Sequence, residues 1–368
     1  MLQHNTKNSV PDLWIAITTL LLLIVGIVIV YSASAVMAAQ KYGDAFYYVK
    51  RQLIFAGLGV VMMFVMLRFE YRKLEQYAKP MLLLCVLFLI AVLIPGVGQI
   101  RNGSRAWLGI GSFGIQPSEF AKLGMILFFS YYLARHQHRI QSFRTGLLPP
   151  LFLIVAFVGL IMLEPDLGQS AVLVGTGLLL VFAAGARVKH LLSLASLGIP
   201  VFVALIIVAP YRLKRIISFL DPWKYPLGEG YHIIQSFFAI GPGGLLGLGL
   251  GHSRQKFFYL PEPQTDFVFS ILAEELGFIG AVTVLLLFLV LIWRGIRTAI
   301  TAPDAFGTLL ATGITGMIAV QVVINISVVT GSMPVTGITL PLISAGGSSL
   351  TLMLTGIGIL LNISRYSK

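Results

Sequence analysis

Long apolar runs separated by short polar segments fill most of this chain. Ten of the runs are long enough, or nearly so, to cross a membrane, because a hydrocarbon core of about 30 Å takes roughly 20 residues at about 1.5 Å per residue. The pattern predicts an all-α polytopic membrane protein that forms a single domain over residues 1–368. Its ten transmembrane helices are expected near residues 13–35, 52–68, 80–95, 119–134, 147–164, 168–185, 191–209, 266–293, 306–330 and 345–364.

Lysine and arginine gather in alternate connections, which orients these helices. With the N-terminus inside, the cytoplasmic segments hold 14 bases and the short outer loops 5, as the positive-inside tendency requires. Both termini are therefore expected in the cytoplasm, with one large extracytoplasmic loop, residues 210–265, between spans 7 and 8. Bases in that loop run against the tendency, which suggests that they have a function there: Arg212, Lys214, Arg215, Lys224, Arg254 and Lys256. The first apolar run is expected to stay as an anchor, since no small-residue cleavage site follows it.

Composition supports this interpretation and narrows the function. The chain is 57% hydrophobic and 11% charged with a mean hydropathy of +0.91, whereas about 25% of residues are charged in soluble domains. The net charge of +12 does not indicate nucleic-acid binding, because the bases lie in short connections. The single cysteine, Cys85, excludes an intramolecular disulfide and a multi-cysteine metal site. The histidine spacings do not resemble a zinc site, and no tightly held metal is predicted.

Three irregular segments are expected on the outer side. Residues 230–240 alternate apolar and polar positions, which favours a helix lying in the membrane interface. The glycines of residues 243–251 are not followed by Lys-Ser or Lys-Thr, so they predict close backbone approach or a bend rather than a phosphate-binding loop. Residues 331–349, broken by Pro and Gly, indicate a re-entrant or broken helix. Such backbone needs protein or a wet cavity around it, which predicts a polar cavity among the spans.

Four acids crowd the junction between the long loop and the eighth span: Glu262, Asp266, Glu274 and Glu275. Asp266, Ser270, Glu274 and Gly277 recur at helical spacing, so we expect them on one face, with Asp266 and Glu274 roughly 12 Å apart along the axis. Intramembrane acids normally face a bundle interior or cavity, and this stripe would line the predicted cavity. Glu275 points to another face and is expected to pack structurally. The alternative for Asp266 is a simple helix N-cap.

Charged residues recur at three further places. Glu119 and Lys122 lie three apart at the start of the fourth span and are predicted to form an inward-facing ion pair; a helix start explains Glu119 alone. Arg105 lies in a loop that could equally face lipid headgroups. Glu164 and Asp166 flank Pro165, where a simple turn is the alternative.

Together these segments resemble the SEDS family (shape, elongation, division and sporulation), ten-span bacterial membrane proteins that include FtsW, RodA and SpoVE. The similarity covers essentially the whole chain. The local sequence at Phe219–Trp223 and Gly241–Gly244 is closest to the FtsW and SpoVE branch of endospore-forming bacteria. The motifs that carry it are Tyr31–Ser34, Lys50–Gln52, Asn102–Arg105, Gln116–Glu119 with Lys122, Glu164–Gly168, Ala209–Arg212, Pro261–Phe267, Glu274–Gly277, Pro334–Gly337 and Gly346–Ser349.

The resemblance implies a peptidoglycan glycosyltransferase of the bacterial cytoplasmic membrane. Such an enzyme polymerises lipid II into glycan strands at the outer face, with a class B penicillin-binding transpeptidase and other division or sporulation membrane proteins as partners. Asp266 matches the family's essential aspartate and would be the general base. A divalent cation, Mg²⁺ or Mn²⁺, could assist the loop bases in stabilising the diphosphate leaving group. The full set of candidate substrate-binding residues is Arg51, Arg105, Glu119, Lys122, Asp166, Arg212, Lys214, Arg215, Arg254, Lys256, Glu274 and Ser348.

Two positions depart from the family pattern. Ala345 stands where a Ser-Tyr-Gly-Gly pattern has Tyr, and Gln169 replaces a frequent Thr. Two other functions fit the pattern of spans: a lipid II flippase, and a non-catalytic scaffold for a transpeptidase in which Asp266 is only a cap. The ionisable residues of the spans cluster toward the outer face, which favours chemistry at one surface over transport through both leaflets.

Overall fold

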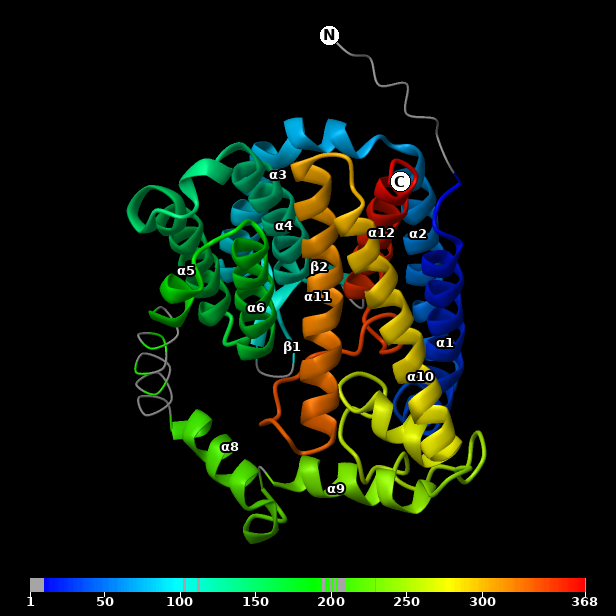
Figure 1. The fold of residues 1–368 in the computed structure, drawn as a ribbon. Coiled ribbons are helices and arrows are strands. Elements are labelled where there is room, and N and C mark those ends of the chain that lie inside the picture. Colours follow the sequence, from blue (N-terminus) through cyan, green and yellow to red (C-terminus); the bar gives the residue numbers. More distant parts are fainter. Residues whose placement is uncertain are drawn as a thin grey trace.

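The computed structural model describes residues 10–367 except 102–103, 111–112, 194–195, 197, 199, 201–202, 204–209 and 229. The described chain is mostly helical, and its helices form an upright bundle (Figure 1). The long helices are α1 (Leu13–Tyr42), α2 (Tyr47–Arg68), α3 (Leu74–Leu93), α4 (Pro117–Arg135), α5 (Leu148–Leu163), α6 (Leu167–Ala183), α10 (Val268–Ile300), α11 (Ala305–Val329) and α12 (Gly347–Ser364). Shorter helices α8 (Pro210–Leu220) and α9 (Tyr231–Ile240) lie across one end.

These nine long helices overlap nine of the ten predicted spans. Seven segments, containing α1, α2, α3, α5, α10, α11 and α12, are long and apolar enough to cross a membrane. Helix α6 is shorter, and α4 carries the charges of Glu119, Lys122 and Arg135. The predicted seventh span, residues 191–209, falls largely outside the described residues.

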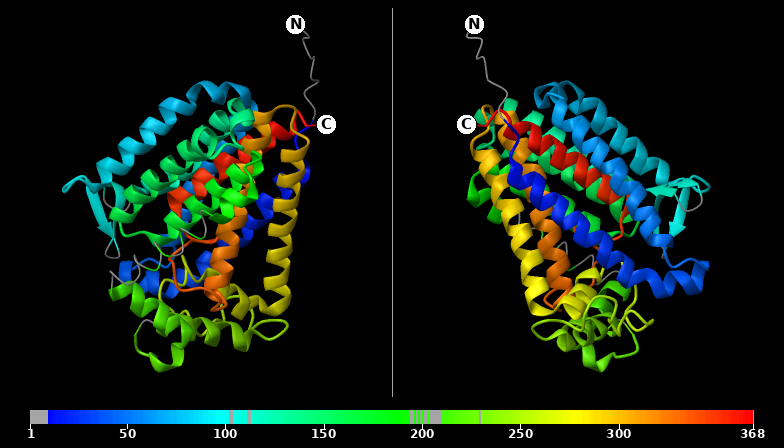
Figure 2. Two further views of the ribbon diagram at one scale, coloured as in Figure 1. Left: turned by 60° about the vertical axis from the view of Figure 1, so that its left-hand side comes forward. Right: turned by 90° about the vertical axis from the view of Figure 1, so that its right-hand side faces the viewer.

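The bundle is layered around α11 and α12. Both are mostly buried, and α11 packs against α4, α6 and α10 while α12 packs along α2. Small residues allow the α2–α12 approach: a Cβ at Gly358 would lie 2.4 Å from the carbonyl oxygen of Met63. Helix α3 lies on the flank of the bundle (Figure 2) and exposes leucines, as a lipid-facing helix does.

The expectation of an all-α chain was wrong between α3 and α4. Residues there form an antiparallel sheet of three strands in the order β1 (Gly98–Arg101), β2 (Ser104–Ile110) and β3 (Phe113–Ile115). Arg101 pairs with Ser104 in its register. The sequence carries the signal for this hairpin, an Asn-Gly dipeptide at 102–103 between the pairing runs, which is typical of two-residue turns.

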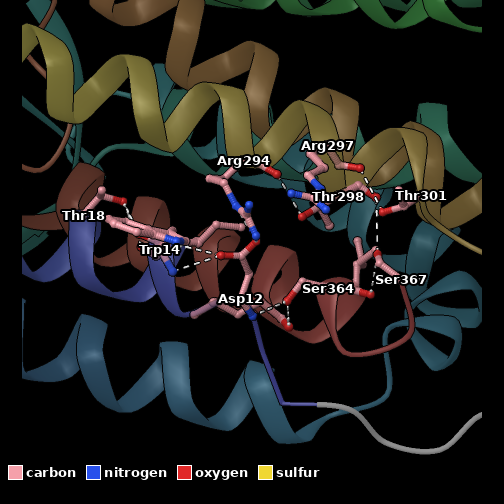
Figure 3. A network of polar contacts seen from close by, with 12 residues as sticks. Asp12, Trp14, Thr18, Arg294, Arg297, Thr298, Thr301, Ser364 and Ser367 are labelled. Carbon is pink, nitrogen blue, oxygen red and sulfur yellow. Dashed lines mark hydrogen bonds and ion pairs between the residues drawn. The ribbon is translucent and has the colours of Figure 1, made fainter.

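Asp12 ties three helices together at the end of the bundle where α1 begins and α12 ends (Figure 3). Its carboxylate caps α1, accepting from the Trp14 amide at 2.9 Å, and also receives the Arg294 Nε of α10 at 2.7 Å. Its own amide donates to the Ser364 hydroxyl of α12 at 3.0 Å. Carboxylates stabilise helix N-termini, so one side chain both starts α1 and joins it to α10.

Candidate active site

Helix α10 is broken at Gly277, which has φ 66° and ψ −167°. The break leaves backbone groups without helical partners, and the glycine-rich segment 243–251 supplies them. The amides of Leu248 and Gly249 donate to the carbonyls of Glu274 and Glu275, each at 3.0 Å. In return the Phe278 amide donates to a carbonyl of the same segment at 2.8 Å.

Glycine is required where these two backbones meet. A Cβ on Gly247 would lie 2.2 Å from the Glu275 carbonyl oxygen, and one on Gly277 would lie 2.3 Å from the Gly247 nitrogen. This confirms that the glycines of 243–251 serve close backbone approach. It also corrects the expectation of one regular polar stripe from Asp266 to Gly277, because Asp266 precedes the helix and Gly277 breaks it.

Glu274 and Glu275 hold the long loop against α10 from a fully buried position. Glu274 accepts from the Ser253 hydroxyl at 2.5 Å and from the Arg254 amide at 2.8 Å. Glu275 accepts from the Ser32 hydroxyl of α1 at 2.5 Å and from Lys256 Nζ at 3.1 Å. The structural role predicted for Glu275 is confirmed by these contacts.

Lys256 belongs to the same buried network. Its ammonium also donates to the Gly251 carbonyl at 2.6 Å and to Ser32 Oγ at 3.2 Å, and the residue is 5% exposed. All these partners are protein groups. The geometry therefore favours a structural role for Lys256 and Glu274 over the contact with substrate predicted for them.

Asp266 lies two residues before α10, outside the membrane-spanning helix. The N-cap position is taken by Phe267, which makes no side-chain cap bond, so the structure does not support Asp266 as a simple cap. Its main-chain carbonyl accepts from Asn325 Nδ2 at 3.0 Å, and the same amide group donates to the Ile338 carbonyl at 2.7 Å. The Asp266 carboxylate faces Gly337, where a Cβ would lie 3.5 Å from Oδ2.

The segment between α11 and α12 packs against this junction. Residues 331–346 are irregular, as predicted, and residues 340–344 within them are buried. Ser344 Oγ donates to the Thr265 carbonyl at 2.6 Å, the Ala345 amide donates to the Gln264 carbonyl at 2.8 Å, and Gln52 Nε2 of α2 donates to the Ser344 carbonyl at 3.2 Å. Protein groups thus satisfy the backbone of this segment at Ser344 and Ala345, as irregular chain in a membrane protein requires.

A second polar cluster lies where α4, α6 and α12 begin. Lys122 Nζ lies 2.9 Å from Glu119 Oε2, with side chains 0% and 4% exposed, which confirms the predicted buried ion pair. Gln169 Nε2 donates to Glu119 at 2.8 Å, while the Gln169 amide donates to Asp166 Oδ1 at 3.0 Å. The residue that departs from the family pattern thus joins the ion pair to Asp166. Ser348 accepts from the amide of Gln116 at 3.3 Å.

A charge in the second cluster affects the pKa of Asp266 in the first. Burial raises the pKa of Asp266 to about 7, and the negative charges of Glu262 and Asp166 add to the effect, against Thr265 and Arg215. Burial also raises the pKa of Asp166, with Glu119 adding to the shift and Lys122 opposing it. Packing links the two regions: a Cβ at Gly168, two residues after Asp166, would lie 2.6 Å from the Thr336 carbonyl oxygen, and the next residue, Gly337, faces the Asp266 carboxylate.

Glu164, next to this cluster, was not a predicted site residue. Its side chain is fully buried, and no described residue donates a hydrogen bond to either carboxylate oxygen. Burial, followed by the charge of Asp166, raises its pKa to about 8. Glu164 is followed by Pro165, which has φ 24°. From the sequence, a simple turn was the alternative to a functional role here.

The remaining predicted cations are spread over several elements. Arg51 in α2 packs over the Tyr47 ring at 5.8 Å. Arg105 in β2 donates to the Leu93 carbonyl at 3.4 Å. Lys214 and Arg254 are exposed, and Arg215 in α8 is close enough to lower the pKa of Asp266. The side chain of Arg212 lies outside the described part of the chain.

The described residues do not form a dedicated metal centre. Within that part of the chain no three His, Cys, Asp or Glu side chains converge as a metal site would require. Asp166 accepts hydrogen bonds from Gln116 Nε2 and from the Gln169 amide.

Fold and site together define a polytopic membrane protein whose acids gather beneath irregular backbone at one end of the bundle. The family model for FtsW, RodA and SpoVE, described as cell cycle protein, matches residues 12–368. The chain belongs to this family.

Individual relatives and solved structures support the same family assignment. Stage V sporulation protein E of Bacillus subtilis is 57% identical over 99% of both chains. A probable peptidoglycan glycosyltransferase FtsW of Geobacter metallireducens is 43% identical over 97% of this chain and 95% of its own. A chain of a peptidoglycan synthase complex that coordinates polymerization and crosslinking superposes with a TM-score of 0.80 at 35% identity, covering 96% of this chain and 98% of that one. The rod shape determining protein RodA of Thermus thermophilus gives 0.71 at 31% identity, covering 96% and 97%.

Proposed function

We propose that this chain is a peptidoglycan glycosyltransferase that polymerises lipid II into glycan strands. Relatives named as such enzymes span nearly its whole length. The observation that carries the proposal is Asp266: its carboxylate lies outside the helix next to Gly337, and its pKa is raised to about 7. A general base is most effective with a pKa near the operating pH.

Asp266 accepts the proton of the acceptor sugar's 4-hydroxyl as that oxygen attacks the anomeric carbon of the donor. The new C–O bond forms while the bond from the anomeric carbon to the diphosphate oxygen breaks, so the configuration inverts and undecaprenyl diphosphate leaves. Cations stabilise the charge that develops on the diphosphate. Lys214, Arg215 and Arg254 remain candidates for this role because they are wholly or partly exposed on the long loop.

A divalent cation would bind together with the substrate, through its diphosphate. Mg²⁺ is commonly held by one or two carboxylates together with substrate phosphates. Mg²⁺ or Mn²⁺ would then arrive on the lipid diphosphate and add charge stabilisation there.

The proposed topology has ten spans, both termini in the cytoplasm and the site facing outward across the bacterial cytoplasmic membrane. Its support is the polarity of the bundle: α1 begins and α12 ends at one end, and α8 and α9 cover the other, where α10 begins (Figures 1 and 2). Helices α8 and α9 belong to the segment 210–265, and their position across this end supports an outer location for that loop.

The proposed partner is a class B penicillin-binding transpeptidase. The structural relative comes from a synthase complex that joins polymerization to crosslinking. The similarity to Stage V sporulation protein E favours a role in sporulation or division, among the membrane proteins of either process.

Polymerisation by the purified full-length chain tests the proposal. The chain, with its transpeptidase partner, is given lipid II, and glycan length is read on gels for wild type, Asp266→Asn and Asp221→Asn. Asp221 pairs with Lys224 in the same loop and its side chain is 43% exposed, so it is the matched control. We expect polymer from wild type and Asp221→Asn and none from Asp266→Asn at unchanged thermal stability.

The alternatives predict other results. A scaffold makes no polymer in any variant. A flippase moves labelled lipid II across vesicles without extending it. Normal polymer from Asp266→Asn would overturn the mechanism.

A further inference from the structure

A cavity of about 290 Å³ opens at the end of the bundle opposite the site, where α3 begins and α4 ends. Four cations and one carboxylate line it, together with Gln76 and Tyr131: the charged residues are Arg72, Lys73, Lys79, Arg135 and Glu75. The mechanism above uses none of these residues. Arg72 pairs with Asp304 at 3.1 Å and Lys73 with Glu70 at 3.8 Å, so one positive charge remains in excess once these acids are counted with Glu75. A hollow with excess positive charge selects an anion.

Two of the cations, Lys79 and Arg135, lie over the Tyr131 ring. The Arg135 guanidinium lies 4.6 Å from the centroid of the Tyr131 ring and the Lys79 ammonium 5.9 Å from it. Arg135 also pairs with Glu75 at 2.9 Å. Among described residues no carboxylate oxygen comes within 4 Å of the Lys79 ammonium, so this cation is available to an incoming anion.

An apolar stripe continues from the cavity along α3. Leu83 and Leu87 follow Lys79 at i+4 and i+8, hence on the same helix face, and are 60% and 52% exposed. Helix α3 lies on the flank of the bundle (Figure 2). A cation at the head of an exposed leucine stripe matches a molecule with an anionic head and an apolar tail, because the tail covers the leucines while the head meets the cations.

We propose that this cavity binds the phosphate headgroup of an anionic phospholipid, with an acyl chain along Leu83 and Leu87. Lys79 and Arg135 contact the phosphate and Gln76 hydrogen-bonds the headgroup. Glu75 keeps Arg135 in place. The bound lipid anchors the end of the bundle where α1 begins and α12 ends. It does so independently of the reaction at the other end.

Binding of short-chain lipid to the full-length chain in detergent tests this inference. The probes are dihexanoyl phosphatidylglycerol and dihexanoyl phosphatidylcholine, followed by native mass spectrometry. We expect phosphatidylglycerol to bind preferentially, and Lys79→Gln to weaken it about fivefold, since one cation near an anionic surface contributes that much. Lys79→Arg keeps the charge and should keep the affinity. Lys189→Gln removes an exposed lysine outside the cavity and should bind as wild type.

Competition separates the possible ligands. Inorganic phosphate and hexaglutamate should displace the lipid poorly, because neither covers the leucine stripe. Equal competition by phosphate would identify a free-anion site, and equal competition by hexaglutamate an acidic protein surface; either overturns the lipid assignment. So would equal binding of the two lipids, or equal loss in Lys79→Gln and Lys189→Gln. Thermal unfolding of each variant shows that a loss is not misfolding.

Discussion

Lys256 lies 3.1 Å from Glu275 in a buried ion pair that joins the long outer loop to α10. Ser32 of α1 donates to the same carboxylate, so three separate parts of the chain meet at one charge. Breaking a buried pair by removing one partner is far more costly than replacing both.

Lys256→Met and Glu275→Gln should therefore each destabilise the protein by about 3–5 kcal/mol. The double variant removes both charges yet keeps the amide oxygen as an acceptor for Ser32, and it should regain most of the loss. Thermal unfolding in detergent measures this. A double variant that folds and also polymerises lipid II confirms a structural role. A double variant that folds but is inactive would instead place Lys256 on the substrate.

The rate of polymerisation should depend on pH through Asp266. A base must be unprotonated, and the pKa of Asp266 is raised to about 7, so the rate should fall about tenfold per pH unit below that value. Glu262 is the second cause of the shift, and Glu262→Gln should move the acid limb to lower pH. Initial rates from pH 5.5 to 8.5 provide the measurement. A flat profile in the wild type contradicts the assignment.

Gly277→Ala should unfold the α10 junction. The φ of 66° is strained for alanine, and its Cβ would meet the backbone of residue 247. We expect a loss of at least about 2 kcal/mol. Gly241→Ala is the control, because φ there is −58° and a Cβ meets nothing within 4 Å. Equal stability of the two variants in thermal unfolding would mean that the close approach of residues 247 and 277 does not contribute to stability.

Glu164 should make stability depend on pH. Its folded pKa is raised to about 8 from the ordinary 4.5, so the unfolded state ionises first and stability falls as pH rises from about 5 to about 8. Glu164→Gln removes the titration and should flatten that fall. The comparison is the thermal midpoint of both proteins at pH 5, 6.5 and 8. Parallel curves would show that this carboxyl does not titrate as its burial requires.

Sequence patterns were informative wherever a single physical rule decided the outcome. Bilayer thickness sets the span lengths, and helical spacing places Lys122 beside Glu119. Density of glycine at 243–251 predicted close backbone approach, which the contact with Gly277 confirms. The Asn-Gly hairpin signal at 102–103 was present but was interpreted as a surface loop.

Long-range partners could not be predicted in the same way. Nothing in the spacing shows that Lys256 turns inward to Glu275 rather than outward to substrate, because that choice depends on Ser32 arriving from α1. Likewise Gln169 departs from the family pattern, and only the packing of α6 on α4 shows that its amide reaches Glu119.

The amide of Asn325 holds the carbonyls of Asp266 and Ile338 at once. One side chain of the central helix α11 thus joins the loop that ends in Asp266 to the irregular segment 331–346. Any movement that parts them to admit a polymer chain must give up one of the two bonds. The position of the Asp266 backbone is therefore tied through Asn325 to that of the segment before α12.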